Sequence, residues 1–255
     1  MASRSIARAD PLAPVRGWWR LLTLALACFA YVVTHLLTRA AGRQSHWPQR
    51  FLARGARICG ADVQVRGQPL SRDVLFVANH QSWLDILIIA GATGTAFVAN
   101  SGVKGWPLIG WLASLNNTIF VDRGDRLGVH GQVGAVRDAL AHHQPVAIFP
   151  EGTTSDGLEL LPFKPSLLEV VSPPPRAIRV QPLRLDYGAG RDLAWVGAEP
   201  APANAWRVLT RPGRFLVNLD CLEPFDPAAA GDRKAIASEA RSRILAGSAW
   251  GPASV

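Results

Sequence analysis

The chain has 255 residues, of which 49% are hydrophobic and 18% are charged. This length and composition support one large domain, or a domain with an appendage, and exclude an intrinsically disordered chain. The formal net charge of +8 favours an anionic partner, such as a polyanion, an anionic membrane surface or a phosphorylated substrate. The three cysteines are far apart in the chain and predict neither a disulfide framework nor a zinc site.

Residues 18–37 form an apolar segment close to the N-terminus. The run from Leu21 to Leu37 carries no formal charge when its histidine is neutral, and it reaches the lower limit of about 17 residues for crossing a bilayer. Residues 46–60 then interleave aromatic and aliphatic side chains with arginines, as in a basic helix lying among lipid headgroups. Residues 1–60 are therefore expected to be membrane-anchoring helices that lie in the bilayer or cross it once. A cleaved signal peptide is the alternative interpretation of the first segment.

From residue 61 to residue 255, strand and helix patterns alternate. Strands are expected at 63–67, 74–79, 95–100, 118–122, 146–152, 177–187 and 213–220, and helices at 83–91, 107–115, 126–143, 165–171 and 232–247. The alternation predicts an α/β domain over 61–255 with a mixed, mainly parallel sheet flanked by helices. Residues 188–206 are rich in Ala, Pro and Gly and are expected to be irregular.

The stretch VANHQSWLDI, residues 77–86, places polar side chains between two apolar runs. The spacing of Ser82 and Asp85 is typical of a capping box at the start of a helix, but a cap does not account for His80. His80 lies just before the expected helix, within reach of the Asp85 carboxylate, which would fix the imidazole tautomer. A neutral, oriented histidine is what a general base requires. A metal site is disfavoured, since two ligands are too few.

Two further polar segments follow expected strands. Arg123 comes after the strand at 118–122 and belongs either to an exposed ion pair or to a cleft at the carboxyl end of the sheet, where its guanidinium group would suit phosphate. FPEGTTSDG, residues 149–157, is either a hydroxyl-rich turn with a solvated Glu151 or part of the same site. The sequence contains no GxSxG, Walker A or GxGxxG pattern of the kind that would indicate a nucleophile elbow or a nucleotide site.

Three blocks, in this order, carry a resemblance to a known family. They are Asn79-His80 with Asp85, NTIFVDR at 117–123 and FPEGT at 149–153, and a fourth block centres on Pro182. The set resembles the glycerolipid acyltransferase family, in particular bacterial 1-acylglycerol-3-phosphate acyltransferases, over roughly residues 60–190. Departures from the usual pattern are Asn117 in place of glycine, Ser166 in place of a small glycine, and Gln181 in place of Val or Ile.

The resemblance implies transfer of a fatty acyl group from acyl-CoA or acyl carrier protein to the hydroxyl of a lysolipid, foremost 1-acyl-sn-glycerol-3-phosphate. His80 would act as the base and Asp85 would orient it, with no metal or organic cofactor. The substrate-binding residues expected on this basis, together with the residue patterns, are Asn79, Ser82, Lys104, Arg123, Glu151, Gly152, Thr153 and Lys164. The expected partners are both substrates and the membrane bilayer, at the cytoplasmic face of the inner membrane, and not nucleic acid.

Two alternatives remain open at this point. The changed second block and Gln181 are compatible with an acceptor that lacks phosphate, such as a lyso-ornithine lipid or another lyso-aminolipid. A membrane-bound lipid-binding protein without turnover is the other alternative, although lipid binding alone does not require His80 beside Asp85.

Overall fold

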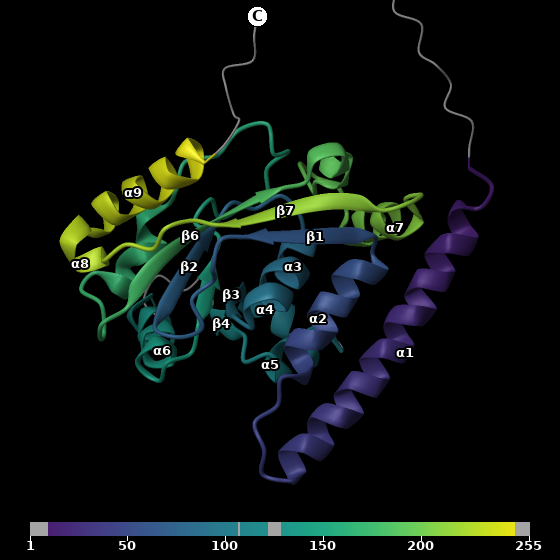
Figure 1. The fold of residues 1–255 in the computed structure, drawn as a ribbon, viewed down its shortest axis with the longest axis horizontal. Helices are drawn as coiled ribbons and strands as arrows, with labels where there is room; N and C mark the ends of the chain where they lie inside the picture. Colours follow the sequence, from purple (N-terminus) through teal and green to yellow (C-terminus); the bar gives the residue numbers. More distant parts are fainter. Residues whose placement is uncertain (1–9, 107, 122–128, 248–255) are drawn as a thin grey trace, which may run out of the picture.

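The chain is described by a computed structural model that covers residues 10–106, 108–121 and 129–247 (Figure 1). The strands are β1 (Ala61–Arg66), β2 (Val74–Ala78), β3 (Ala96–Asn100), β4 (Ile119–Val121), β5 (Val146–Ile148), β6 (Arg179–Asp186) and β7 (Phe215–Cys221). They form one sheet in the order β1-β7-β6-β2-β5-β3-β4, in which every neighbouring pair is parallel except β6 and β7. The mixed, mainly parallel sheet expected from the sequence is confirmed.

Helices cover both faces of this sheet. They are α1 (Ala13–Ala40), α2 (Trp47–Ile58), α3 (Leu84–Thr93), α4 (Ser101–Lys104), α5 (Ile109–Leu115), α6 (Val129–Ala141), α7 (Ala201–Thr210), α8 (Pro227–Ala230) and α9 (Arg233–Ala246), with 3₁₀ helices η1 (Pro165–Val171) and η2 (Gly188–Leu193). Strand β2 is buried throughout, and its side chains alternate between the two faces. Phe76 packs with residues of α2, α3 and α7, whereas Leu75 and Val77 pack with α6, η1 and α9.

The order of the strands gathers three loops at one edge of the sheet. β2 lies between β5 and β6 and is parallel to both, with Val77 opposite Ile148 and Ala78 opposite Leu183. The carboxyl ends of these strands therefore meet, and open α/β sheets bind ligands outside such ends. The segments that leave this edge begin with Asn79 after β2, Phe149 after β5 and Tyr187 after β6.

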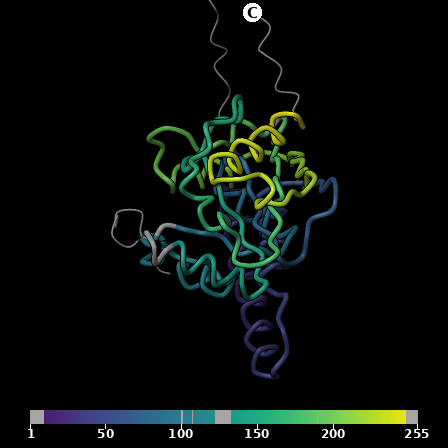
Figure 2. The backbone as a smooth tube through the Cα atoms, turned by 90° about the vertical axis from the view of Figure 1, so that its left-hand side faces the viewer, coloured from purple at the N-terminus to yellow at the C-terminus, as the bar shows by residue number. Residues whose placement is uncertain are grey.

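The N-terminal helices α1 and α2 form a hairpin whose tip projects beyond the rest of the molecule (Figure 1, Figure 2). An 18-residue window of α1 has a mean hydropathy of 2.0 and is not buried, so by length and composition this helix could cross a membrane. Its first half is nevertheless attached to α7. The Arg16 guanidinium donates a 2.9 Å hydrogen bond to the Thr210 carbonyl, and Gly17 packs so closely on Trp206 that an added Cβ would lie 2.9 Å from the indole.

The expectation that residues 188–206 are irregular is wrong, because η2 and the start of α7 lie within them. The composition misled because proline disrupts the interior of a helix but is well tolerated in its first turn, which is where Pro202 lies in α7. Asn204 is fully buried in this helix and accepts a 3.0 Å hydrogen bond from the Trp83 indole. Residues 165–171, expected to be a helix, form the 3₁₀ helix η1.

A pair of helical glycines tests the close packing of α2 on α3. An added Cβ at Gly91 in α3 would lie 2.7 Å from the Cα of Ala53 in α2, whereas one at Gly134 in α6 would meet nothing within 4 Å. We expect Gly91→Ala to lower the free energy of unfolding by about 1–3 kcal/mol because it forces two backbones apart. Gly134→Ala should raise it by up to about 1 kcal/mol through helix propensity. Thermal unfolding in detergent would measure both, and equal shifts would contradict the packing argument.

Candidate active site

His80 and Asp85 are in direct contact at the carboxyl end of β2. The Nδ1 atom of His80 lies 2.7 Å from Oδ2 of Asp85. The Asp85 side chain is fully buried, and the His80 side chain is 19% exposed. When Nδ1–H donates to the carboxylate, the lone pair is on Nε2, which is then the nitrogen able to accept a proton from a substrate. The pair therefore has the arrangement of an oriented general base at a partly open surface.

The Asp85 carboxylate is held by three further donors. Oδ2 accepts from the backbone N–H groups of Gln81 at 2.7 Å and Ser82 at 3.0 Å, and Oδ1 accepts from the Tyr187 hydroxyl at 2.5 Å. Asp85 also lies in the first turn of α3, where the helix dipole favours a negative charge. The bond from Ser82 N–H is the reciprocal half of the expected capping box, although the helix itself is capped at Trp83. These contacts fix the carboxylate that orients His80.

The imidazole ring of His80 is also fixed by stacking. It lies 3.9 Å from the Phe149 ring, centroid to centroid, at an interplanar angle of 10°. Phe149 in turn stacks on Phe97 at 5.4 Å. The main chain of His80 is tied to the loop after β5, because its carbonyl accepts from Ser155 N–H at 2.8 Å. The first and third sequence blocks are thus joined around one imidazole.

Glu151 holds the main chain of His80 from inside the protein. Its carboxylate accepts a 2.6 Å hydrogen bond from the backbone N–H of His80 and a 3.0 Å hydrogen bond from that of Leu161. Glu151 is only 2% exposed. Burial raises the pKa of Glu151 to about 7, and this effect outweighs the two backbone donors, which lower the pKa. Near neutral pH, both protonation states of this carboxyl group are therefore populated.

The raised pKa of Glu151 predicts a pH-dependent stability. The folded protein favours the protonated carboxyl group, so the stabilisation is present in full below the ordinary pKa of 4.5 and is lost as the pH rises through about 7. Across this window the free energy of unfolding should fall by about 3 kcal/mol more in the native protein than in Glu151→Gln. Urea unfolding at pH 5 and pH 8 measures the difference. Glu159→Gln, which alters an exposed carboxylate, is the matched control, and a native-like pH dependence in Glu151→Gln would contradict the prediction.

Three of the expected substrate-binding residues are buried and form hydrogen bonds within the protein. Asn79 is 1% exposed, and its amide exchanges hydrogen bonds with the main chain of Leu185, at 3.0 Å as donor and 2.8 Å as acceptor. Ser82 is fully buried, and its hydroxyl accepts a 3.4 Å hydrogen bond from Leu84 N–H. Glu151 was also expected to bind substrate, but its oxygens accept from the main chain. Asn79 and Glu151 join segments that are distant in the chain, whereas Ser82 bonds within its own segment, and in each case a buried polar group has an internal partner.

The other expected site residues do not all lie together: some are adjacent, and others lie apart from them or outside the described residues. Gly152 has a φ of +72°, and an added Cβ there would lie 2.5 Å from Nζ of Lys164, so this glycine and lysine are adjacent. Thr153, in the same turn, is exposed. Lys104 ends α4 and is exposed, and within the described residues it forms no hydrogen bond or ion pair with the other site residues. Arg123 lies outside the described residues.

Tyr187 and Phe149 also belong to this site, and neither was predicted as a site residue from the sequence. Tyr187 is 2% exposed and directly follows β6, and Phe149 directly follows β5. Their positions after parallel strands were an available signal, because these strand ends converge. Within the described part of the chain, no three His, Cys, Asp or Glu side chains form a group able to hold a metal ion.

Comparisons with known proteins show which family the chain belongs to. The family model described as Acyltransferase matches residues 62–185. The lyso-ornithine lipid O-acyltransferase of Brucella abortus is 31% identical over 242 residues, which cover 88% of this chain and 89% of that protein. The corresponding enzyme of Rhizobium meliloti is 37% identical over 170 residues, or 62% of this chain and 58% of that protein.

Two other proteins extend the comparison. The 1-acyl-sn-glycerol-3-phosphate acyltransferase of Neisseria gonorrhoeae is 30% identical over 175 residues, 68% of each chain. The crystal structure of the 1-acyl-sn-glycerophosphate acyltransferase PlsC of Thermotoga maritima has the same fold, with a TM-score of 0.68, 22% identity, and coverage of 92% of this chain and 95% of that one. The chain therefore belongs to the acyltransferase family, and it is an acyltransferase.

Proposed function

We propose that the protein moves a fatty acyl group from acyl-CoA or acyl carrier protein to the free hydroxyl of a lysolipid at a membrane surface. The single observation that carries this proposal is the contact of the partly exposed His80 imidazole with the buried Asp85 carboxylate at 2.7 Å. A binding protein without turnover has no need of a histidine held by a carboxylate, a stacked ring and its own main chain.

In the proposed reaction, Nε2 of His80 takes the proton of the acceptor hydroxyl while the hydroxyl oxygen attacks the thioester carbonyl carbon. Asp85 stabilises the imidazolium that forms. The tetrahedral intermediate then collapses, its carbon–sulfur bond breaks, and the leaving thiolate takes the proton from His80. The products are an ester and a free thiol, and this chemistry requires neither a metal nor a resident cofactor.

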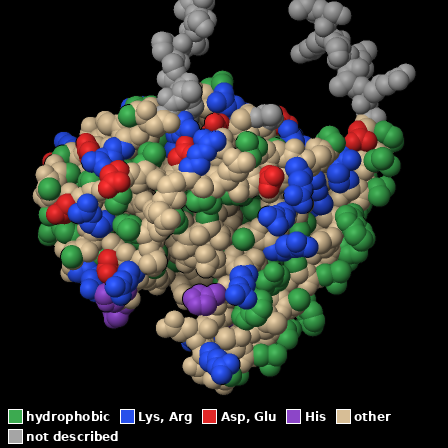
Figure 3. Space-filling model, in the orientation of Figure 1, with side chains coloured by type: hydrophobic (Ala, Val, Ile, Leu, Met, Phe, Trp, Pro, Cys, Tyr) green, Lys and Arg blue, Asp and Glu red, His purple; other side chains and the backbone are tan. Residues whose placement is uncertain are grey.

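The N-terminal helices support work at a membrane. Exposed large apolar side chains follow α1 at alternating spacings of four and three residues, and they are Val15, Trp19, Leu22, Leu26, Phe29, Val33 and Leu36. This spacing places them on one stripe of the helix. Figure 3 shows a band of hydrophobic side chains along the outer edge of α1, with Lys and Arg side chains beside it. We infer that the stripe contacts the cytoplasmic leaflet of the inner membrane, since both thioester donors are soluble in the cytoplasm.

The relatives favour a lyso-ornithine lipid as the acceptor. The proteins of Rhodobacter capsulatus and Brucella abortus that carry this name align over 88% of the chain. The second candidate is 1-acyl-sn-glycerol-3-phosphate, the acceptor expected from the sequence, and the Neisseria gonorrhoeae enzyme supports it over 68% of the chain. The two acceptors differ at their headgroups, one an amino acid and the other a phosphomonoester.

Initial rates decide between the acceptors. The purified full chain would be given acyl-CoA with either lyso-ornithine lipid or 1-acyl-sn-glycerol-3-phosphate in mixed micelles, and thiol release would be followed together with lipid mass spectrometry. We expect the lyso-ornithine lipid to react faster. Faster turnover of the phosphate acceptor would select the second candidate, and no acylation of any lysolipid, with either donor, would overturn the proposed function.

A further inference from the structure

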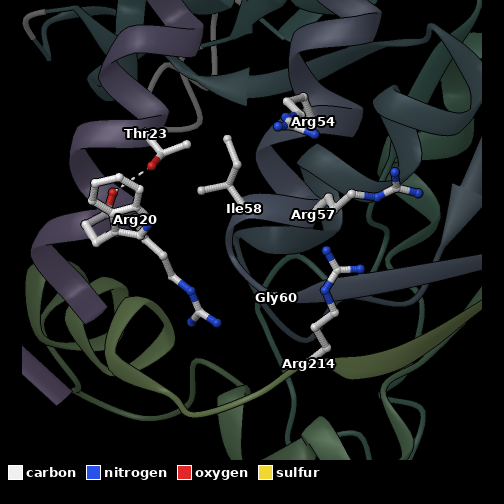
Figure 4. A pocket seen from close by; sticks show the side chains of 8 residues that line it. Arg20, Thr23, Arg54, Arg57, Ile58, Gly60 and Arg214 are labelled. Atoms are coloured by element: carbon white, nitrogen blue, oxygen red, sulfur yellow. Dashed lines mark hydrogen bonds between the residues drawn. The ribbon is translucent and has the colours of Figure 1, made fainter. Parts of the chain in front are cut away.

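A cavity away from the active site lies between the N-terminal helices and the edge of the sheet (Figure 4). It has a volume of about 260 Å³ and is lined by Trp19, Arg20, Thr23, Arg54, Arg57, Ile58, Gly60 and Arg214. Four of these eight residues are arginines, and none is acidic. They come from α1, from α2 and from the residue before β7, so only the folded chain brings them together.

Arg20 forms the rigid wall of this cavity. Its guanidinium donates to backbone carbonyls at the end of α7 and just beyond it, including those of Arg211 at 2.9 Å and Gly213 at 3.0 Å. An added Cβ at Gly60 would lie 3.2 Å from Nη2 of Arg20, so the main chain there comes close to this guanidinium. Burial and the nearby cations, Arg214 among them, lower the pKa of Arg20. The group is therefore a fixed positive charge in a partly desolvated position.

The other three arginines are exposed, and no acidic side chain among the described residues pairs with them. Within the described residues, the side chains of Arg54, Arg57 and Arg214 form no hydrogen bond or ion pair. Arg54 and Arg57 are three residues apart and so lie on one side of α2. Like charges that share a cavity repel one another, and a bound anion would relieve that repulsion. The geometry of the guanidinium fork matches phosphate oxygens.

The cavity adjoins the apolar stripe of α1. Trp19 belongs both to the stripe and to the cavity wall, and its side chain is 68% exposed. Leu22 and Leu26 continue the stripe from that point. A ligand with a phosphate group in the cavity and apolar chains along α1 would satisfy both surfaces, and indole side chains favour the boundary between the two environments.

We propose that this cavity binds the phosphate group of an anionic bilayer lipid, whose acyl chains contact the stripe of α1. The lipid would hold the enzyme on the membrane and is distinct from the lysolipid acceptor. The inference rests on the proposed function only in taking the enzyme to work at a membrane surface. The proposed binding differs from a general attraction of the basic protein to a negatively charged membrane, because it requires the guanidinium groups of particular arginines.

Vesicle cosedimentation of the full chain tests the proposal. The probes are phosphatidylcholine vesicles with and without phosphatidylglycerol. Arg57→Ala with Arg214→Ala should weaken binding to the anionic vesicles at least about tenfold, because two phosphate contacts are lost. The charge-matched control, Arg39→Ala with Arg43→Ala, removes two exposed arginines outside the cavity and should weaken binding by no more than about threefold.

A second pair of variants keeps the net charge. Arg57→Lys with Arg214→Lys should still weaken binding at least about threefold, because a lysine cannot form the paired contacts of a guanidinium group. Native-like binding by this lysine pair, or equal losses in the two alanine pairs, would show diffuse electrostatics and overturn the site. Melting curves of all variants would confirm that they fold.

Competition separates a lipid from free phosphate. Monomeric dihexanoyl phosphatidylglycerol should displace the protein from anionic vesicles, whereas inorganic phosphate at the same concentration should not. Equal competition by the two would overturn the lipid assignment. His80→Ala should bind the vesicles as the native protein does, so this binding result stands or fails independently of acyl transfer.

Discussion

Replacing His80 by alanine should lower the rate of thiol release from acyl-CoA by about 10²–10⁴-fold, the usual contribution of a general base. The loss is expected in kcat, because in the proposed reaction the imidazole takes the proton that moves in the transition state and does not provide a major binding surface. The variant also loses the stacking on Phe149, so its fold would be checked by circular dichroism.

A matched histidine provides the control for this variant. His142 is exposed at the end of α6, and its Nδ1 lies 2.7 Å from the Asp138 carbonyl. His142→Ala removes an imidazole far along the chain from the site and should keep native turnover. If folded His80→Ala protein also released thiol at the native rate, the histidine would not be the base.

Asp85→Asn should lower turnover by about 10²-fold or more, although it barely changes the shape of the side chain. Oδ2 accepts from the N–H groups of Gln81 and Ser82, so the amide oxygen would take its place beside His80. The imidazole would then keep its hydrogen-bond partner but lose the negative charge that stabilises its protonated form. The amide must also lie among the N–H groups of Gln81 and Ser82 and the Tyr187 hydroxyl, all of which donate to the carboxylate. We expect the free energy of unfolding to fall by about 1–3 kcal/mol as well.

Two measurements separate these consequences of Asp85→Asn. Turnover measured well below the melting temperature reports the catalytic effect, and urea unfolding reports the stability effect. Asp156→Asn, which alters an exposed carboxylate in the loop after β5, should change neither. Native turnover in Asp85→Asn would rule out a catalytic role for the charge of the carboxylate.

The spacing of residues along the chain was enough to predict the central pair of the site. His80 and Asp85 are five residues apart, and a strand followed by a helix turns such a pair toward one edge of a sheet. The roles of buried residues were harder to predict, because they depend on which strands are neighbours. Tyr187 reaches Asp85 only because β6 lies beside β2, an order that the sequence does not state.

Burial shows which of the expected polar residues bond within the protein. In the sequence, Asn79 and Glu151 are polar residues at the ends of strands. The sequence alone does not distinguish a residue there that binds substrate from one that forms hydrogen bonds within the protein. Asn79 bonds to the main chain of Leu185, and Glu151 bonds to that of His80, so both amide and carboxylate are used within the protein. Packing in the folded protein likewise stabilises α7, although the Pro and Gly content of its segment did not predict a helix.

If α1 contacts the membrane as proposed, its attachment to α7 would set the height of the active site above the lipid. A flexible tether would let a catalytic group sample many depths, but the bonds from Arg16 and Arg20 and the contact of Gly17 make the anchor and the α/β body one rigid unit. His80 would then meet only hydroxyls at one level of the headgroup layer. Selection among lysolipids can therefore arise from how deeply the hydroxyl sits, in addition to the chemistry of the headgroup.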